Sequence, residues 1–240
     1  FLLGFLNCGV FSVSAKSARF NGLTDVESFD LLSKKEVDWG FFRKNHVSMI
    51  FQDPSSALNP TMICGEQIKE SCFFLKKKVS NSFCFDLLKD VGILFPKKVY
   101  YSFPHQLSGG QKQRVVIAIA LACGPNLLIA DEPTTSLDPS IQRSVLDLVL
   151  KLRERHNLSV VLISHNLELI RYYCDRVYFL KNRSFINVLN TEKKQELFDL
   201  DFILNKIRNR EYPVFSSSKK SFFKTKRLFL KQKKSVCIFD

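Results

Sequence analysis

Short apolar runs that stop at polar residues recur along this sequence. They cover residues 47–51 (VSMIF), 126–130 (NLLIA), 160–163 (VVLI) and 177–180 (VYFL). Runs of four or five apolar residues bounded by turn-forming residues are typical of strands buried on both faces. The pattern therefore predicts four core strands.

Segments with a helical period lie between these runs. Two of them present one apolar face each: Val116, Ile119, Ala120 and Cys123 in residues 111–123, and Val145, Leu148, Val149 and Leu152 in residues 141–155. Residues 64–100 are also mostly helical in pattern, with lysine-rich interruptions. Buried strands that alternate with amphipathic helices predict an α/β fold with a mostly parallel sheet.

Three polar residues come just after predicted strands: Gln52, Asp131 and His165. Ligands bind at the carboxyl ends of the strands in such sheets, so we expect these side chains to converge on one crevice. Taken singly, a Gln or a His after a strand is more often an ordinary turn residue.

The first chemical motif is LSGGQ, at residues 107–111, directly before a predicted helix. A serine at a helix start is usually only an N-cap. Here two glycines, Gly109 and Gly110, let backbone N–H groups approach a ligand, and the helix N-terminus favours an anion. The motif is therefore a candidate phosphate site.

The second motif is LLIADEP, at residues 127–133. A strand that ends in two carboxylates suits an ATPase, because Asp131 can hold Mg²⁺ while Glu132 orients or deprotonates the attacking water. On its own, an Asp-Glu-Pro turn is better explained as a solvated turn.

The order of the motifs favours the chemical interpretation. LSGGQ, a helix, LLIADEP, Ser136-Leu137-Asp138 and a strand ending at His165 follow one another in one chain. This series resembles the nucleotide-binding domain of ABC ATPases over roughly residues 1–190. The resemblance implies a P-loop NTPase-like α/β fold with an inserted helical subdomain at about residues 62–107, followed by a divergent basic tail at residues 191–240.

The resemblance also implies a role for each matched residue. Glu132 is the expected general base, His165 contacts the γ-phosphate, and Gln52 meets Mg²⁺ and water together with Asp131. The expected contacts to ATP bound by a second ATPase subunit, identical or paralogous, come from Ser108, Gly109, Gly110, Gln111 and Asp138.

Finer matches resemble the dipeptide, oligopeptide and nickel importer branch: FQDP at residues 51–54, LNP at 58–60 and FPHQ at 103–106. They imply an ATP-hydrolysing subunit at the cytoplasmic face of the cell membrane that powers peptide uptake. Its implied partners are membrane permease subunits, a second ATPase and, indirectly, an extracytoplasmic solute-binding protein.

One family motif does not occur. The 240 residues contain no G-x-x-x-x-G-K-[ST], since Lys16-Ser17 follows Ala15 rather than glycine. We expect the phosphate-binding loop to lie upstream of Phe1, and poor ATP binding by these residues alone. The alternative is a non-catalytic remnant that lends its signature motif to a paralogous ATPase.

The charge of +13 raises a third possibility, an ABC ATPase of the DNA-repair type. Those proteins insert coiled coils or zinc modules between the glutamine and the signature, whereas only 56 positions separate Gln52 from Ser108 and no C-x-x-C occurs. We therefore expect no nucleic-acid partner.

The end of the chain is strongly basic, because residues 214–240 carry eight lysines and arginines against one acid. This composition predicts a solvated tail. The seven cysteines predict reduced thiols.

Overall fold

A six-stranded sheet organises the molecule. The computed structural model describes residues 19–21, 28–30, 39–73, 79–135, 137–181, 184–190 and 235–239. The strands, in sheet order, are β3 (Val47–Ile50), β4 (Leu127–Asp131), β5 (Ser159–Ile163), β8 (Ser235–Phe239), β6 (Arg176–Lys181) and β7 (Ser184–Asn190). Every neighbouring pair is parallel except β6 and β7, so the prediction of a mostly parallel α/β sheet is confirmed.

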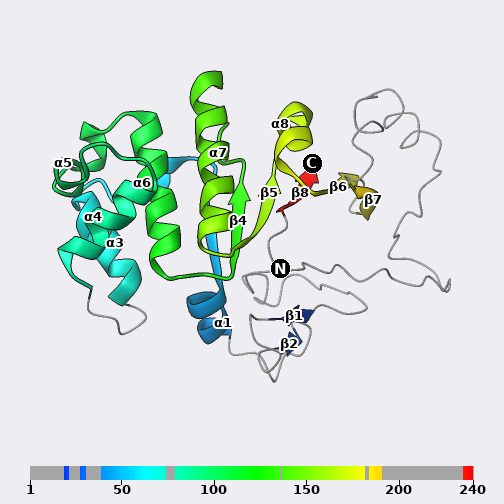
Figure 1. The fold of residues 1–240 in the computed structure, drawn as a ribbon, viewed down its shortest axis with the longest axis horizontal. Helices are drawn as coiled ribbons and strands as arrows, with labels where there is room; N and C mark the ends of the chain where they lie inside the picture. The colour runs from blue at the N-terminus through cyan, green and yellow to red at the C-terminus, as the bar shows by residue number, and fades with distance from the viewer. Residues whose placement is uncertain are drawn as a thin grey trace.

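Strand β8 comes from the basic tail, yet it lies inside the sheet between β5 and β6 (Figure 1). Ile238 pairs with Ile163 on one side, and Cys237 pairs with Val177 on the other. The expectation of a solvated tail is therefore wrong for Ser235–Phe239. The chain runs from β5 through a helix to β6 and leaves one strand position open, and a segment rich in β-branched and aromatic residues satisfies the backbone groups on both sides of it.

The helices are α1 (Trp39–His46), α2 (Pro54–Ala57), α3 (Cys64–Phe73), α4 (Asn81–Asp90), α5 (Pro96–Tyr100), α6 (Gly109–Ala122), α7 (Pro139–Arg155) and α8 (Leu167–Tyr173), with a 3₁₀ turn at Pro104–Gln106. A separate antiparallel pair is formed by β1 (Arg19–Asn21) and β2 (Ser28–Asp30). Figure 1 shows α3, α4 and α5 gathered at one end of the molecule, in the range where we expected a helical subdomain. That subdomain boundary remains a prediction.

Helix α6 differs from its predicted pattern. We expected one apolar face, but eight of its fourteen residues are buried, including the polar Gln113. The reason is that α6 packs against α3, α2 and α4 as well as β3 and α7, so hardly any side of it faces water. Helix α7 has the expected single stripe, with Val145, Leu146, Leu148, Val149 and Leu152 buried.

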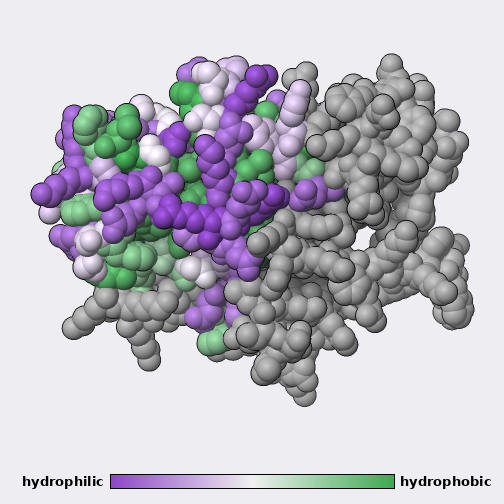
Figure 2. Space-filling view, viewed as in Figure 1, coloured by the Kyte–Doolittle hydropathy of each residue, from purple (hydrophilic) through white to green (hydrophobic). Residues whose placement is uncertain are grey.

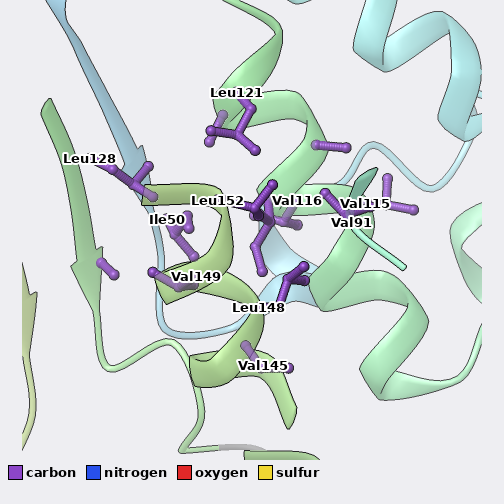
Figure 3. Close-up of a cluster of buried hydrophobic side chains, with 14 of the residues drawn as sticks. Ile50, Val91, Val115, Val116, Leu121, Leu128, Val145, Leu148, Val149 and Leu152 are labelled. Carbon is purple, nitrogen blue, oxygen red and sulfur yellow. The ribbon is translucent and has the colours of Figure 1, made fainter. Parts of the chain in front are cut away.

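The core joins the helices to the strands that carry the polar residues. Figure 3 shows Val116 of α6, Leu148 and Leu152 of α7, Ile50 of β3 and Leu128 of β4 in one cluster. Full burial of such a side chain contributes about 1.5–3 kcal/mol. This packing fixes the ends of β3 and β4 relative to the start of α6.

Most described cysteines are reduced, as expected. Cys64, Cys72, Cys84 and Cys123 form no disulfide, and burial raises the pKa of the Cys64 and Cys84 thiols to about 11. Cys174 is disulfide-bonded, so the prediction of reduced thiols is wrong for that residue.

Hydrophilic residues cover much of the visible face in front of the sheet, and hydrophobic patches lie over the helical end (Figure 2). Within the described ranges, none of the helices combines the length and the apolar character needed to cross a bilayer.

Candidate active site

Three predicted residues meet at one edge of the sheet. Gln52 follows β3, Glu132 directly follows β4, and His165 follows β5. Because β3, β4 and β5 are adjacent and parallel, their carboxyl ends lie side by side. Glu132 Oε2 accepts a hydrogen bond from Gln52 Nε2 at 3.1 Å, and Glu132 Oε1 lies 2.6 Å from His165 Nδ1. Gln52 and His165 therefore converge as predicted, but the residue at which they meet is Glu132 rather than Asp131.

The backbone at Glu132 is unusual. Its φ is +44°, in the left-handed region that L residues with a side chain rarely adopt. Its N–H donates to the Ile163 carbonyl of β5 at 2.9 Å, and its own carbonyl accepts from the Thr135 N–H at 3.3 Å. The turn after β4 is thus tied to the neighbouring strand, and this strained geometry is of the kind that often occurs at functional sites.

The surroundings of Glu132 favour its ionised form. The hydrogen bond with His165, followed by that from Thr135, lowers the pKa of Glu132 below its usual range, and partial burial opposes this shift. The side chain retains 20% of its exposure. At neutral pH this group is a carboxylate, accessible to water and able to accept a proton.

Asp131 and Gln52 are the residues predicted to supply oxygen ligands. Asp131 is the last residue of β4, half-buried and in register with Ile163 of β5. Gln52 uses its amide nitrogen toward Glu132, which leaves the amide oxygen to act as a ligand. No cluster of three or more His, Cys, Asp or Glu suited to a metal occurs in the described part of the chain. This donor set fits Mg²⁺, which is typically held by one or two carboxylates together with phosphate oxygens and waters.

The LSGGQ motif forms the start of α6. Ser108 Oγ accepts from the Gln111 N–H at 3.3 Å, and Gln111 Oε1 accepts from the Ser108 N–H at 3.1 Å, which is a capping box. Ser108, Gly109 and Gln111 are exposed and Gly110 is half-buried. A Cβ at Gly110 would lie 3.1 Å from Ile141 Cγ2, so glycine permits the close approach of α6 to α7.

Asp138 begins α7 but does not cap it. It occupies the N-cap position with an exposed side chain that makes no hydrogen bond to the helix. An N-cap aspartate usually accepts from a backbone N–H of the first turn. The carboxylate is therefore available to another group. Ser136, which the resemblance places in the same loop, lies outside the described residues.

One neighbour of Glu132 was missed by the sequence analysis. Thr135 Oγ1 donates to Glu132 Oε2 at 2.7 Å. In the sequence, Thr135 is a hydroxyl residue three positions after an acid at the end of a strand. This pattern is equally typical of an ordinary turn. Within the described residues, Ser108 and Glu132 make no hydrogen bond to each other.

Comparison with known proteins agrees with this geometry. A model of the ABC transporter family matches residues 24–135, and one described as an AAA domain, putative AbiEii toxin, Type IV TA system, matches residues 103–171. The oligopeptide transport ATP-binding protein AppD of Bacillus subtilis is 46% identical over 160 residues, covering 65% of this chain and 49% of AppD. OppD of Lactococcus lactis is 45% identical over 163 residues, covering 64% and 48%. The chain thus spans about half the length of these relatives.

Solved structures give the same result. The dimeric ATP-binding cassette MJ0796, in a post-hydrolysis state bound to ADP and Pi, aligns with a TM-score of 0.55 at 27% identity over 65% of this chain and 67% of that one. The cbiO1 structure from Clostridium perfringens, part of the ABC transporter complex cbiONQ, aligns with a TM-score of 0.59 at 25% identity over 80% and 76%. The chain is therefore similar to ABC transporter ATP-binding proteins, among them relatives named for oligopeptide and dipeptide transport.

Proposed function

We propose that this chain is the ATP-hydrolysing subunit of an ABC importer for peptides, attached to the cytoplasmic face of the cell membrane. The observation that carries the proposal is the Glu132 carboxylate, held at the end of β4 between Gln52 and His165. The names of AppD, OppD and DppD support peptides as the transported solute.

Glu132 acts as the general base. One of its carboxylate oxygens takes a proton from water as the water oxygen attacks the γ-phosphorus and the bond to ADP breaks. Its lowered pKa keeps it ionised at neutral pH. His165 turns from Glu132 to the γ-phosphate, and the Gln52 amide oxygen joins Asp131 in holding Mg²⁺, which neutralises phosphate charge when bound.

The start of α6 serves a second ATPase subunit. In the structure the Ser108 oxygen is an acceptor within the capping box, so its O–H proton remains able to donate to a phosphate. The Gly109 and Gly110 N–H groups lie in the first turn, where a helix has no internal acceptors for them. We place these groups, with Gln111 and Asp138, against the γ-phosphate of the partner's ATP, as the dimeric state of the MJ0796 relative suggests.

We also propose a role for each of the remaining parts of the chain. Residues 1–190 make up the nucleotide-binding domain, and the helical range at about residues 62–107 contacts the permease subunits. Residues 191–240 form a divergent basic tail that contributes one strand to the sheet. These 240 residues contain no G-x-x-x-x-G-K-[ST] motif for the site at Glu132.

The test isolates the protein with its native partners, through a tag added at its own gene, and measures Mg-ATP hydrolysis and peptide uptake. Glu132→Gln keeps the shape but removes the base, so we expect kcat to fall by about 10²–10⁴-fold. Glu154→Gln is the matched control, because Glu154 is an exposed acid near the end of α7 that pairs with Arg153. Full turnover in the Glu132→Gln complex would show that this proposal is wrong.

A second candidate follows from the exposed Ser108 and the missing phosphate-loop motif: a non-catalytic subunit that lends its signature to a paralogue. In that case Ser108→Arg abolishes hydrolysis by the complex while Glu132→Gln leaves it unchanged. For the leading function both changes lower it, so the pair of variants separates the two candidates.

A further inference from the structure

Three side chains contact the carboxylate of Glu132, and they come from different distances along the chain. Gln52 and His165 reach it from the ends of β3 and β5, 80 and 33 positions away along the chain. Thr135 reaches it from the same turn, three positions later. Any shift of the strand ends relative to one another moves the first two contacts but leaves the third intact.

The bond from Thr135 is also shorter than the bond from Gln52. Thr135 Oγ1 lies 2.7 Å from Glu132 Oε2, against 3.1 Å for Gln52 Nε2 at the same oxygen. A hydroxyl that donates to a carboxylate at this distance makes a charge-assisted hydrogen bond. The β-branched side chain restricts χ1, so the hydroxyl loses little freedom in making the bond.

The backbone of the turn supports the same arrangement. The Thr135 N–H donates to the Glu132 carbonyl and the Leu137 N–H to the Thr134 carbonyl, so two consecutive turns follow the strained Glu132. Main chain and side chain of Thr135 thus both bind Glu132. The Thr135 hydroxyl uses only Oε2 of Glu132, and Oε1 is in contact with His165.

We propose that Thr135 is the positioning residue of Glu132, holding Oε2 so that Oε1 is presented to the attacking water. This inference rests on the proposed function, in which Gln52 and His165 leave Glu132 for Mg²⁺ and phosphate. Of the three residues that contact Glu132, only Thr135 then stays hydrogen-bonded to it. Thr135 therefore fixes the rotamer of the base during the reaction. Thr135 does not touch substrate and acts only through Glu132.

The kinetic test compares Thr135→Val, which keeps the shape but removes the hydroxyl, with Thr135→Ser, which keeps the donor. In the native complex we expect Thr135→Val to lower kcat about 3- to 10-fold with KM unchanged, and Thr135→Ser to stay within about twofold of wild type. Thr61→Val is the matched control, since the Thr61 hydroxyl makes a similar exposed bond to Asn59. Equal losses in Thr135→Val and Thr135→Ser, or no loss in Thr135→Val, would overturn the inference.

A double-mutant cycle separates this inference from the proposed function. If Thr135 acts through Glu132, Thr135→Val causes no further loss of the residual turnover left in Glu132→Gln. A further loss of several-fold contradicts the positioning role. Full turnover in Glu132→Gln alone contradicts the proposed function instead.

A spectroscopic measurement tests the contact without any nucleotide. The ¹³C signal of the Glu132 carboxyl carbon, assigned by its disappearance in Glu132→Gln, is recorded at pH 7 in the nucleotide-free chain. We expect the same chemical shift in wild type and Thr135→Ser and a displaced one in Thr135→Val. An unchanged signal in Thr135→Val shows that the hydroxyl does not bind the carboxylate.

Discussion

At the residue scale, Ser108 combines a structural task with a chemical one. Its oxygen accepts the Gln111 N–H and caps α6, while its proton is free for a ligand. The two tasks use different parts of one hydroxyl group. A single substitution to alanine removes both, so the two tasks have to be separated with a pair of variants.

Ser108→Ala and Ser108→Asp form that pair. Alanine cannot cap, so we expect the free energy of unfolding of the chain to fall by about 1 kcal/mol, whereas aspartate is a good N-cap and preserves it. Aspartate places a negative charge where phosphate is expected, so nucleotide-dependent association with a second ATPase is lost in Ser108→Asp despite normal stability. Urea denaturation and ATP-dependent dimerisation give the two readouts. Equal loss of stability in both variants would contradict the capping role.

The sequence predicts that polar residues cluster at the strand ends, but it does not predict the geometry of this cluster. Gln52, Asp131 and His165 were expected together because each follows a strand of one parallel sheet, whereas in the structure Gln52 and His165 meet at Glu132. The positive φ of Glu132 has no local signal, since it depends on the hydrogen bond from its N–H to Ile163, 31 positions away. The contact from Thr135 follows from that backbone and so could not be predicted either.

At the element scale, α3 and α5 are joined by a buried tyrosine. The Tyr100 hydroxyl donates to Glu66 Oε1 at 2.8 Å, and Lys69 Nζ donates to the same oxygen at 3.0 Å. Gly65 packs directly on the Tyr100 ring, where a Cβ would overlap it. Helix α3 therefore depends on one small residue and one carboxylate for its position against α5.

Glu66 gives this contact a pH dependence. The hydrogen bonds from Lys69 and then Tyr100 lower its pKa below the unfolded value of 4.5. Its contribution is therefore complete above pH 4.5 and is lost as the pH falls through the lower folded pKa. Since Glu66 is 46% exposed, we expect Glu66→Gln to reduce stability at pH 7 by no more than about 1 kcal/mol. The difference from wild type should shrink as the pH falls below 4.5 and through the lower folded pKa of Glu66.

Chemical denaturation of wild type and Glu66→Gln across this range measures the difference. Asp86→Asn is the comparison, because Asp86 and Lys89 form a similar exposed pair three residues apart, and its effect should be smaller. A difference that grows as the pH falls would reverse the sign and contradict the assignment.

Helix positions were predicted more reliably than helix environments. The stripe of α7 was correct because one side of that helix faces water, whereas α6 is enclosed by α3, β3 and α7. Residues 111–123 contain enough alanine and valine to fit either situation. What surrounds a helix depends on elements distant in sequence, and periodicity does not report on them.

At the scale of the whole molecule, the mostly parallel sheet was predicted from the sequence, but the order of its strands and the place of β8 were not. Ser235–Phe239 is a five-residue apolar run at the end of a lysine-rich tail, and such short runs do not identify their partners. Its neighbours β5 and β6 lie more than 50 positions earlier in the chain. The position of β8 is set by its backbone pairing with both β5 and β6.

The importance of β8 for the fold can be measured through Ile238. This residue pairs with Ile163 of β5 and with Tyr178 of β6, so proline there removes a backbone donor from the interior of the sheet. We expect Ile238→Pro to lose about 3 kcal/mol, which lowers Tm by roughly 6–12 °C for a domain of this size. Ile238→Val keeps the N–H and β-branching and should change Tm by only a few degrees. Thermal unfolding distinguishes the outcomes, because a tail outside the sheet would leave both variants at the wild-type Tm. Since β5 also carries the Ile163 carbonyl that anchors Glu132, loss of β8 should disturb the candidate active site as well as the fold.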